Sequence, residues 1–331
     1  MKKKIAIVAG GDSSEYGVSL RSAAGIESFL NKNKYDITIV LLRGTDWKAK
    51  VGEDQWVTID KNDFSYTLNG NKVVFDFAYI TIHGTPGENG LLQGYFDILG
   101  IPYSCCGVLA AAITFNKYTC NHYLKTFGIR VAESVLLRKN ATRPTDKEII
   151  EQVGLPCFIK TNVGGSSFGV TKVKTLEEVE PAIEKAFAEG HEVICEAFMQ
   201  GTEITCGVYK TSSHATAFPI TEVVTSNEFF DYDAKYNGQV DEITPARIPD
   251  HIRDQVQALT LKIYDILGCK GIIRVDYILT NGNDGELEIN LLEVNTTPGM
   301  TPTSFIPQQV RAAGLVIGDV LSNIIEDAFV K

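Results

Sequence analysis

The chain has 331 residues, of which 44% are hydrophobic and 22% are charged. This composition is typical of a soluble globular protein, and the length predicts two or three domains. The formal net charge of −10 argues against nucleic acid or an anionic membrane surface as a general partner. The seven cysteines lack CxxC or Cys/His spacing, which indicates reduced thiols rather than a disulfide framework or a zinc site.

The chain begins with three lysines near the apolar run Ile5–Ala9. This run is too short for the apolar region of a signal peptide, and no apolar stretch of about 18 residues occurs elsewhere. We therefore expect a cytoplasmic protein without a membrane partner.

The first part of the chain alternates short apolar runs with helical patterns, which predicts a parallel sheet with helical crossovers. We expect a strand, a helix and two further strands, at Ile5–Ala9, Ser19–Leu30, Ile37–Leu42 and Val73–Ile82. Ligands gather beyond the carboxyl ends of such strands, where Gly10–Glu15 and His83-Gly84 lie. Tight turns also need glycines, and the absence of GxGxxG argues against a dinucleotide-binding fold.

From about residue 113 the pattern changes, and strands with antiparallel character follow Gly201. The expected helices and strands are Thr114–Phe127, Ser134–Arg138, Cys157–Lys160, Thr175–Glu189, Glu192–Glu196 and Ile252–Leu267. This pattern indicates a mixed α/β and α+β protein of three compact units, residues 1–105, 106–196 and 197–331. The parallel α/β sheet belongs to the first unit.

Polar side chains share one face of two apolar strands near the end of the chain. In the sequence LLEVN, Glu293 and Asn295 are two residues apart and project to the same side. The preceding strand, IIRVDY, presents Arg274 and Asp276 in the same way, and a polar segment between the strands predicts a hairpin. In matching register, Asp276, Glu293 and Asn295 converge as oxygen donors, which favours Mg2+ over zinc. The alternative is a surface hairpin with exposed acids.

A glycine–serine loop, residues 164–167, follows the strand that ends at Lys160. Its backbone N–H groups can approach an anion, its serine hydroxyls add donors, and Lys160 adds positive charge. The loop does not have the GxxxxGK[ST] sequence, which excludes the usual P-loop arrangement. A plain turn is the alternative.

Eight segments spread over the whole chain resemble one known family. They are GGDSSEYGVSLRSA, TIHGTPGENGLLQGYFDILGIPYSCCG, FNKYTCNHYL, FIKTNVGGSSFGVTKV, FFDYDAKYNG, ITPARI, GIIRVDYIL and LLEVNTTPGMTPTSFIPQQ. In this order they resemble the D-alanine–D-alanine ligases, ATP-grasp enzymes of bacterial cell-wall synthesis. The resemblance implies a three-domain ATP-grasp fold, ATP and D-alanine as substrates, and a homodimer formed through the first domain.

The resemblance also implies a nucleotide site between the second and third domains. Its residues would be Lys117, Lys160, Ser167, Glu196, Phe198, Met199 and Glu203. Two Mg2+ ions, for which Mn2+ can substitute, are implied on Asp276, Glu293 and Asn295, with Glu293 bridging them.

In the chemistry that the resemblance implies, ATP converts one D-alanine to an acyl phosphate, which the amine of a second D-alanine then attacks. The implied catalytic residues are Glu15, Ser166, Lys235, Tyr236, Arg274 and the backbone N–H of Gly299. The second substrate would lie beside His83, with its carboxylate on Ser304 and the N–H of Phe305. By spacing alone, Glu15 also fits an exposed helix-start carboxylate, and His83 a structural histidine.

Two alternatives of different kinds remain. One is another ATP-dependent carboxylate–amine ligase or a D-alanine–D-lactate ligase, which Tyr236 disfavours because the depsipeptide-forming relatives lack a tyrosine there. The other is a nucleotide-binding sensor without catalysis. A sensor is disfavoured because five residues of the expected machinery are all present: Lys160, Lys235, Arg274, Asp276 and Glu293.

Overall fold

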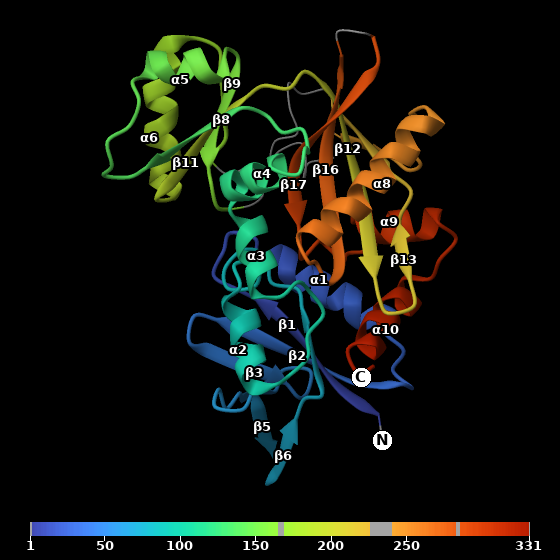
Figure 1. Ribbon diagram of the computed structural model, residues 1–331. Helices are drawn as coiled ribbons and strands as arrows, with labels where there is room; N and C mark the ends of the chain where they lie inside the picture. Colours follow the sequence, from blue (N-terminus) through green and yellow to red (C-terminus); the bar gives the residue numbers. More distant parts are fainter. Residues whose placement is uncertain (1, 165–168, 226–239, 283–284, 331) are drawn as a thin grey trace.

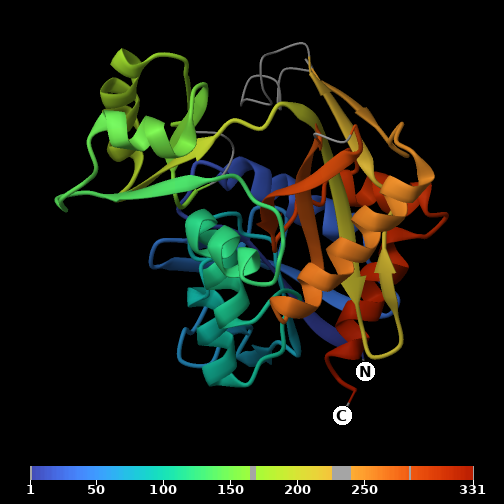
Figure 2. The ribbon, with the colours of Figure 1, turned by 45° about the horizontal axis from the view of Figure 1, so that its top comes forward.

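The structure is a computed structural model that describes residues 2–164, 169–225, 240–282 and 285–330. In this part of the chain the strands form three main sheets, each at the centre of one unit (Figure 1). Figure 2 shows the central unit standing apart at the upper left, while the first and third units lie against each other.

The first sheet has a parallel centre, as the alternating pattern predicts. β1 (Lys3–Gly10) pairs in parallel with β2 (Tyr35–Arg43) on one side and with β7 (Phe77–Ile80) on the other. Helix α1 (Tyr16–Phe29) makes the crossover from β1 to β2. An antiparallel edge, which the sequence did not indicate, consists of β3 (Asp46–Lys50) and β4 (Trp56–Thr58). Helix α2 (Leu91–Leu99) follows this sheet.

The expectation of one strand over Val73–Ile82 is wrong, because the segment divides between two sheets. β6 (Asn71–Val74) forms a hairpin with β5 (Ser65–Leu68), and β7 then enters the main sheet. The change occurs at Asp76, whose backbone N–H donates to the carbonyl of Lys4 and whose carboxylate accepts the Lys4 N–H at 2.7 Å. A continuous apolar run does not reveal where the chain moves from one sheet to another.

The expected helix Thr114–Phe127 is also divided. Asn116 adopts an extended conformation, which ends α3 (Val108–Phe115), and its side chain accepts the Thr119 N–H as the N-cap of α4 (Lys117–Lys125). Lys117 therefore occupies the first position of a helix rather than the middle of one.

The central unit is an antiparallel sheet with helices on one face. The sheet order is β10-β9-β11-β8, from strands Thr171–Val173, Cys157–Thr161, Glu192–Ala197 and Ser134–Arg138. Its helices are α5 (Asp146–Val153), the short η1 (Leu176–Glu178) and α6 (Val179–Glu189). The helices cover Cys157 and Ile159 in a common core, so Phe158 and Lys160, which alternate with them, face the opposite side.

The third sheet has helices on both faces. Its order is β15-β14-β12-β16-β17, from strands Val240–Ile243, Thr221–Thr225, Gly201–Lys210, Gly271–Asn281 and Leu287–Asn295, with β13 (Ala215–Ala217) beside β12. Helix α8 (Asp250–Ile266) packs on the face that carries Ile273 and Val275. Helix α9 (Phe305–Ala312) packs on the face that carries Ile272.

The end of the chain returns to the first unit. Helix α10 (Ile317–Asp327) packs Leu321 and Ile325 into the same core as Ile5 and Ile7 of β1, and both ends of the chain lie at this side (Figure 1). All seven cysteines are free, as expected, and all of them are buried. None of the helices within the described residues combines the length and apolar character that crossing a membrane requires.

Candidate active site

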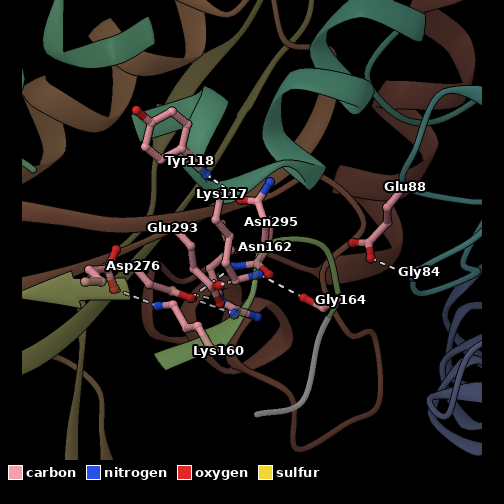
Figure 3. A network of polar contacts seen from close by, with 12 residues as sticks. Gly84, Glu88, Lys117, Tyr118, Lys160, Asn162, Gly164, Asp276, Glu293 and Asn295 are labelled. Atoms are coloured by element: carbon pink, nitrogen blue, oxygen red, sulfur yellow. Dashed lines mark hydrogen bonds and ion pairs between the residues drawn. The ribbon is translucent and has the colours of Figure 1, made fainter. Parts of the chain in front are cut away.

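The hairpin of β16 and β17 has the register that the sequence predicts. Asp276 stands opposite Glu293, and Arg274 stands opposite Asn295. The Asn295 amide donates to Asp276 Oδ2 at 2.9 Å, so the two carboxylates and the amide lie together (Figure 3). The structure thus brings together the three expected oxygen donors.

A β-bulge at Leu292 makes this arrangement compatible with a buried strand. Glu293 pairs with Asp276, but Leu291 pairs with the next residue, Tyr277, so Leu292 is the extra residue. Strict alternation would place Leu291 on the same face as Glu293. Because of the bulge, Leu291 and Val294 both enter the core while Glu293 faces the site. The sequence did not reveal this bulge.

Three cations surround the acids. The Arg274 guanidinium donates to both carboxylate oxygens of Asp276, at 2.8 and 2.7 Å. The Lys117 ammonium lies 3.4 Å from Glu293 Oε2, and the Lys160 ammonium donates to Glu196 Oε2 at 2.6 Å. These groups come from β16, α4 and β9, so the site joins elements of the second and third units.

The electrostatic environment keeps Lys160 charged. Burial alone would lower the pKa of its ammonium, but the carboxylates of Glu196, Glu293 and Glu203 outweigh burial and raise it. The pKa of Arg274 is raised in the same way, since Asp276 and then Glu293 outweigh its burial. Glu203 also raises the pKa of Arg274, so Glu293 and Glu203 both stabilise the charged forms of Lys160 and Arg274.

The donor set fits a magnesium ion that is shared with a phosphate ligand. Within the described ranges, three or more His, Cys, Asp or Glu side chains are nowhere grouped so that they could hold a metal ion by themselves. The hairpin instead offers two carboxylates and the Asn295 amide. Mg2+ is usually bound by one or two carboxylates together with substrate phosphates and waters. A zinc site would instead require nitrogen or sulfur ligands.

Four further residues of the expected nucleotide site lie on β11 or after it: Glu196, Phe198, Met199 and Glu203. Glu196, which is buried, contacts Lys160, and the Phe198 ring packs edge-on against Phe158 with 5.8 Å between ring centres. The Lys172 ammonium lies 4.2 Å from the Phe198 ring centre. Met199 follows Phe198, while Glu203 lies on β12. Glu196 and Phe198 therefore lie with Lys160 and Phe158 on the face of the central sheet that its helices leave open.

The first unit contributes His83 and Glu15 at the ends of β7 and β1. His83 is 7% exposed, and its Nε2 lacks a hydrogen-bond partner among the described residues. Burial lowers the pKa of this imidazole, Glu15 opposes the shift and Arg274 adds to it. These three residues therefore lie in one electrostatic environment. A buried ring nitrogen of this kind is typically satisfied by a ligand or by ordered water.

The start of α9 carries Ser304 and Phe305, the residues expected to bind the carboxylate of the second substrate. Ser304 precedes the helix, and its hydroxyl accepts the Thr301 N–H at 3.1 Å rather than capping α9. The Arg274 guanidinium lies 5.3 Å from the centre of the Phe305 ring. A Cβ at Gly299 would lie 3.0 Å from Ser304 Oγ, which shows how closely the backbone approaches there. A helix N-terminus beside an arginine favours an anionic group.

Four expected site residues lie outside the part of the chain that the structure describes: Ser166, Ser167, Lys235 and Tyr236.

Glu88 is a site residue that the sequence analysis missed. Its carboxylate accepts the Gly84 N–H at 2.7 Å (Figure 3). Burial raises the pKa of Glu88 to about 7, the hydrogen bond from Gly84 opposes the rise, and the charge of Glu15 adds to it. An acid in a glycine-rich loop looks exposed in the sequence, and only the spatial approach to Glu15 and Lys117 reveals its position.

Replacement of Glu88 by glutamine is expected to change how stability depends on pH. In the wild type, the unfolded chain releases this proton near pH 4.5 while the folded chain holds it to about pH 7, so stability falls as pH rises between them. Urea unfolding at about pH 5 and about pH 8 should show Glu88→Gln gaining stability relative to wild type at the higher pH. Exposed Glu184→Gln is the control, and an equal pH dependence for all three proteins would contradict the assignment.

Comparison with known sequences agrees with this geometry. Residues 123–326 match the family described as D-ala D-ala ligase C-terminus, and residues 4–106 match D-ala D-ala ligase N-terminus. The D-alanine–D-alanine ligase of Bacteroides fragilis is 65% identical over 329 residues, which cover 99% of this chain and 100% of that protein. The corresponding ligase of Bacteroides thetaiotaomicron is 66% identical with the same coverage.

Solved structures agree as well. The VanG D-Ala:D-Ser ligase from Enterococcus faecalis has a TM-score of 0.86 at 32% identity, covering 99% of this chain and 100% of its own. The D-alanine–D-alanine ligase from Bacillus anthracis complexed with ATP has a TM-score of 0.77 at 29% identity, covering 98% and 97%. The expected ATP-grasp fold, with a parallel sheet in the N-terminal region, is confirmed. The chain belongs to the D-alanine–D-alanine ligase family.

Proposed function

We propose that this protein joins two D-alanine molecules to D-alanyl-D-alanine, with ATP as co-substrate, for peptidoglycan precursor synthesis. The observation that carries the proposal is the set of three cations around Asp276 and Glu293, in a chain 65% identical to a ligase of that name. The ATP complex of the Bacillus anthracis relative supports ATP as co-substrate.

In the first step, a carboxylate oxygen of one D-alanine attacks the γ-phosphorus of ATP, and ADP leaves. Lys117 and Lys160 hold the phosphates, and Glu15 binds the ammonium of this substrate. Mg2+ held by Asp276, Glu293 and Asn295 would neutralise negative charge on the triphosphate. The product is a D-alanyl phosphate, whose phosphate is a far better leaving group than oxide.

In the second step, the amine of another D-alanine attacks the acyl carbon, and phosphate leaves with the former carboxylate oxygen. Arg274 and the Gly299 N–H stabilise the oxyanion, and one such donor typically contributes about 3 kcal/mol. The incoming carboxylate binds Ser304 and the Phe305 N–H. His83 Nε2 has no hydrogen-bond partner among the residues that the structure describes, which supports the place of His83 beside this substrate.

The remaining assignments rest on the family resemblance. Lys235 holds the transferring phosphoryl group, Ser167 contacts ATP, and Ser166 and Tyr236 form a hydrogen-bonded set with Glu15. The three domains span residues 1–105, 106–196 and 197–331, and the protein acts in the cytoplasm.

The second amino acid is the point on which the relatives differ, since one similar structure is named a D-Ala:D-Ser ligase. Mass spectrometry of products formed from ATP and a mixture of D-alanine, D-serine and D-lactate tests this point. We expect D-alanyl-D-alanine as the main product at neutral pH. If the main product were D-alanyl-D-serine or D-alanyl-D-lactate, the proposed specificity for D-alanine as second substrate would be wrong. Phosphate release from ATP in the absence of any amino acid would contradict the ligase activity.

Glu293→Gln should abolish turnover while leaving the fold intact. A neutral amide cannot balance Mg2+ and Lys117 as the carboxylate does, so we expect activity to fall about a hundredfold or more. Glu288→Gln on the same strand is the matched control, because Glu288 pairs at 2.6 Å with Arg130 at the surface. Phosphate release measured over a Mg2+ titration should separate the two variants. Near-normal activity of Glu293→Gln at ordinary Mg2+ would reject the metal assignment.

A homodimer through the first unit and the adjoining start of the second is supported by an exposed apolar face on α2 and α3. The face consists of Leu91, Gly94, Ile98, Val108 and Leu109. Ile98 is 86% exposed and Leu109 is 74% exposed, and the face is continuous because a Cβ at Gly94 would lie 3.7 Å from Val108. Apolar faces of this kind usually mark protein interfaces, and symmetric dimers are the commonest assembly.

Light scattering after size-exclusion chromatography tests this dimer. We expect the wild type at twice the chain mass and the double variant Ile98→Asp with Leu109→Asp at the chain mass. Leu155→Asp, at a partly exposed leucine of the central unit, is the control and should leave the mass unchanged. A monomeric wild type, or a double variant that stays dimeric, would contradict the proposal.

A further inference from the structure

We propose that Asn162 is a positioning residue for the nucleotide site, because it caps helix α4 from the end of strand β9 and thereby fixes the Lys117 ammonium beside Glu293. The inference rests on the proposed role of Lys117 in holding ATP phosphates. Asn162 itself touches neither substrate in this assignment.

Asn162 accepts hydrogen bonds from the first backbone N–H groups of α4, although it lies outside that helix. It directly follows β9 and is fully buried. Its backbone carbonyl accepts the Lys117 N–H at 3.2 Å, and its side-chain Oδ1 accepts the Tyr118 N–H at 2.8 Å (Figure 3). The first N–H groups of a helix have no partner within the helix. Asn162 therefore supplies two caps, and Asn116 supplies the next one, to Thr119.

The orientation of the Asn162 amide is determined by Glu192 on β11. The amide Nδ2 donates to Glu192 Oε2 at 2.7 Å, so Oδ1 must point towards α4, since a carboxylate can only accept. Asn116 and Arg138 donate to the same carboxylate, at 3.2 and 2.9 Å. Burial would raise the pKa of Glu192, but the bonds from Asn162 and Arg138 outweigh it and lower the pKa.

One short segment thus places both lysines. Residues 160–164 carry Lys160 itself, cap the helix of Lys117 through Asn162, and bind the Lys117 ammonium through the Gly164 carbonyl at 2.8 Å (Figure 3). The Lys117 side chain begins at the capped first position of α4 and ends 3.4 Å from Glu293. Without the cap, the first turn of α4 is no longer held in place. The backbone of Lys117 then loses its fixed position, so its ammonium is less well placed although the Lys117 side chain itself is unchanged.

A purely structural cap would affect stability but not nucleotide recognition, and steady-state kinetics separate the two roles. We expect Asn162→Ala to raise the KM for ATP about tenfold and to leave the KM for D-alanine unchanged. Thr145→Ala is the matched control, because it removes the capping box of α5 in the same unit. It should lower the melting temperature similarly without changing the KM for ATP. An unchanged KM for ATP in Asn162→Ala would overturn the proposal.

A double-mutant cycle shows whether Asn162 acts through Lys117. Lys117→Met should raise the KM for ATP, and adding Asn162→Ala to it should cause no further rise. A further tenfold rise in the Lys117→Met background would overturn the proposal and leave the role of Lys117 intact. If Lys117→Met itself has a normal KM for ATP, the proposed role of Lys117 fails, and this inference fails with it.

Should Asn162→Ala not fold, Glu192→Gln provides the same test. A neutral amide at position 192 no longer requires Nδ2 of Asn162 to face it, so the Tyr118 cap is weakened without creating a cavity. We expect a several-fold rise in the KM for ATP, again absent when Lys117 is Met. A normal KM for ATP in Glu192→Gln would overturn the proposal.

Discussion

Asp276 and Glu293 stand opposite each other on neighbouring strands, and the cations beside them offset the repulsion between their like charges. Arg274 binds Asp276 along the same strand, while Lys117 approaches Glu293 from α4. The balance of these charges is the constraint on which the site depends. In the proposed function, this balance would let a nucleotide triphosphate and Mg2+ add charge of both signs while each buried charge keeps a partner.

The same constraint explains the connections between the units. Lys160 belongs to the central sheet, so that sheet must be held against the hairpin, and Asn162 makes the attachment through α4. The first unit must present His83 to Arg274, and it is joined to the third unit by α10 and by the close contact of Gly271. A Cβ at Gly271 would lie 1.9 Å from the Ser104 carbonyl, so only glycine allows this approach.

The sequence was informative where one strand could be interpreted by itself. The two-residue spacing of Glu293 and Asn295 in an apolar run predicts their common face, and the register with Asp276 follows from the hairpin. The bulge at Leu292, by contrast, depends on the need to bury Leu291 and Val294 together, which is a tertiary requirement. Glu88 and Asn162 were missed for a similar reason, because their partners are distant in sequence. In the sequence, both are polar residues in predicted loops, which are common and indicate no role, and only the fold brings their partners close.

In the proposed mechanism, the carboxylate of the first D-alanine is phosphorylated before the peptide bond forms. The most direct test uses D-alanine labelled with 18O in its carboxylate, with mass spectrometry of the inorganic phosphate released during dipeptide synthesis. We expect each phosphate to carry one labelled oxygen, because the bridging oxygen of the acyl phosphate comes from the carboxylate and leaves with phosphorus. Phosphate without label, accompanied by normal dipeptide formation, would contradict it.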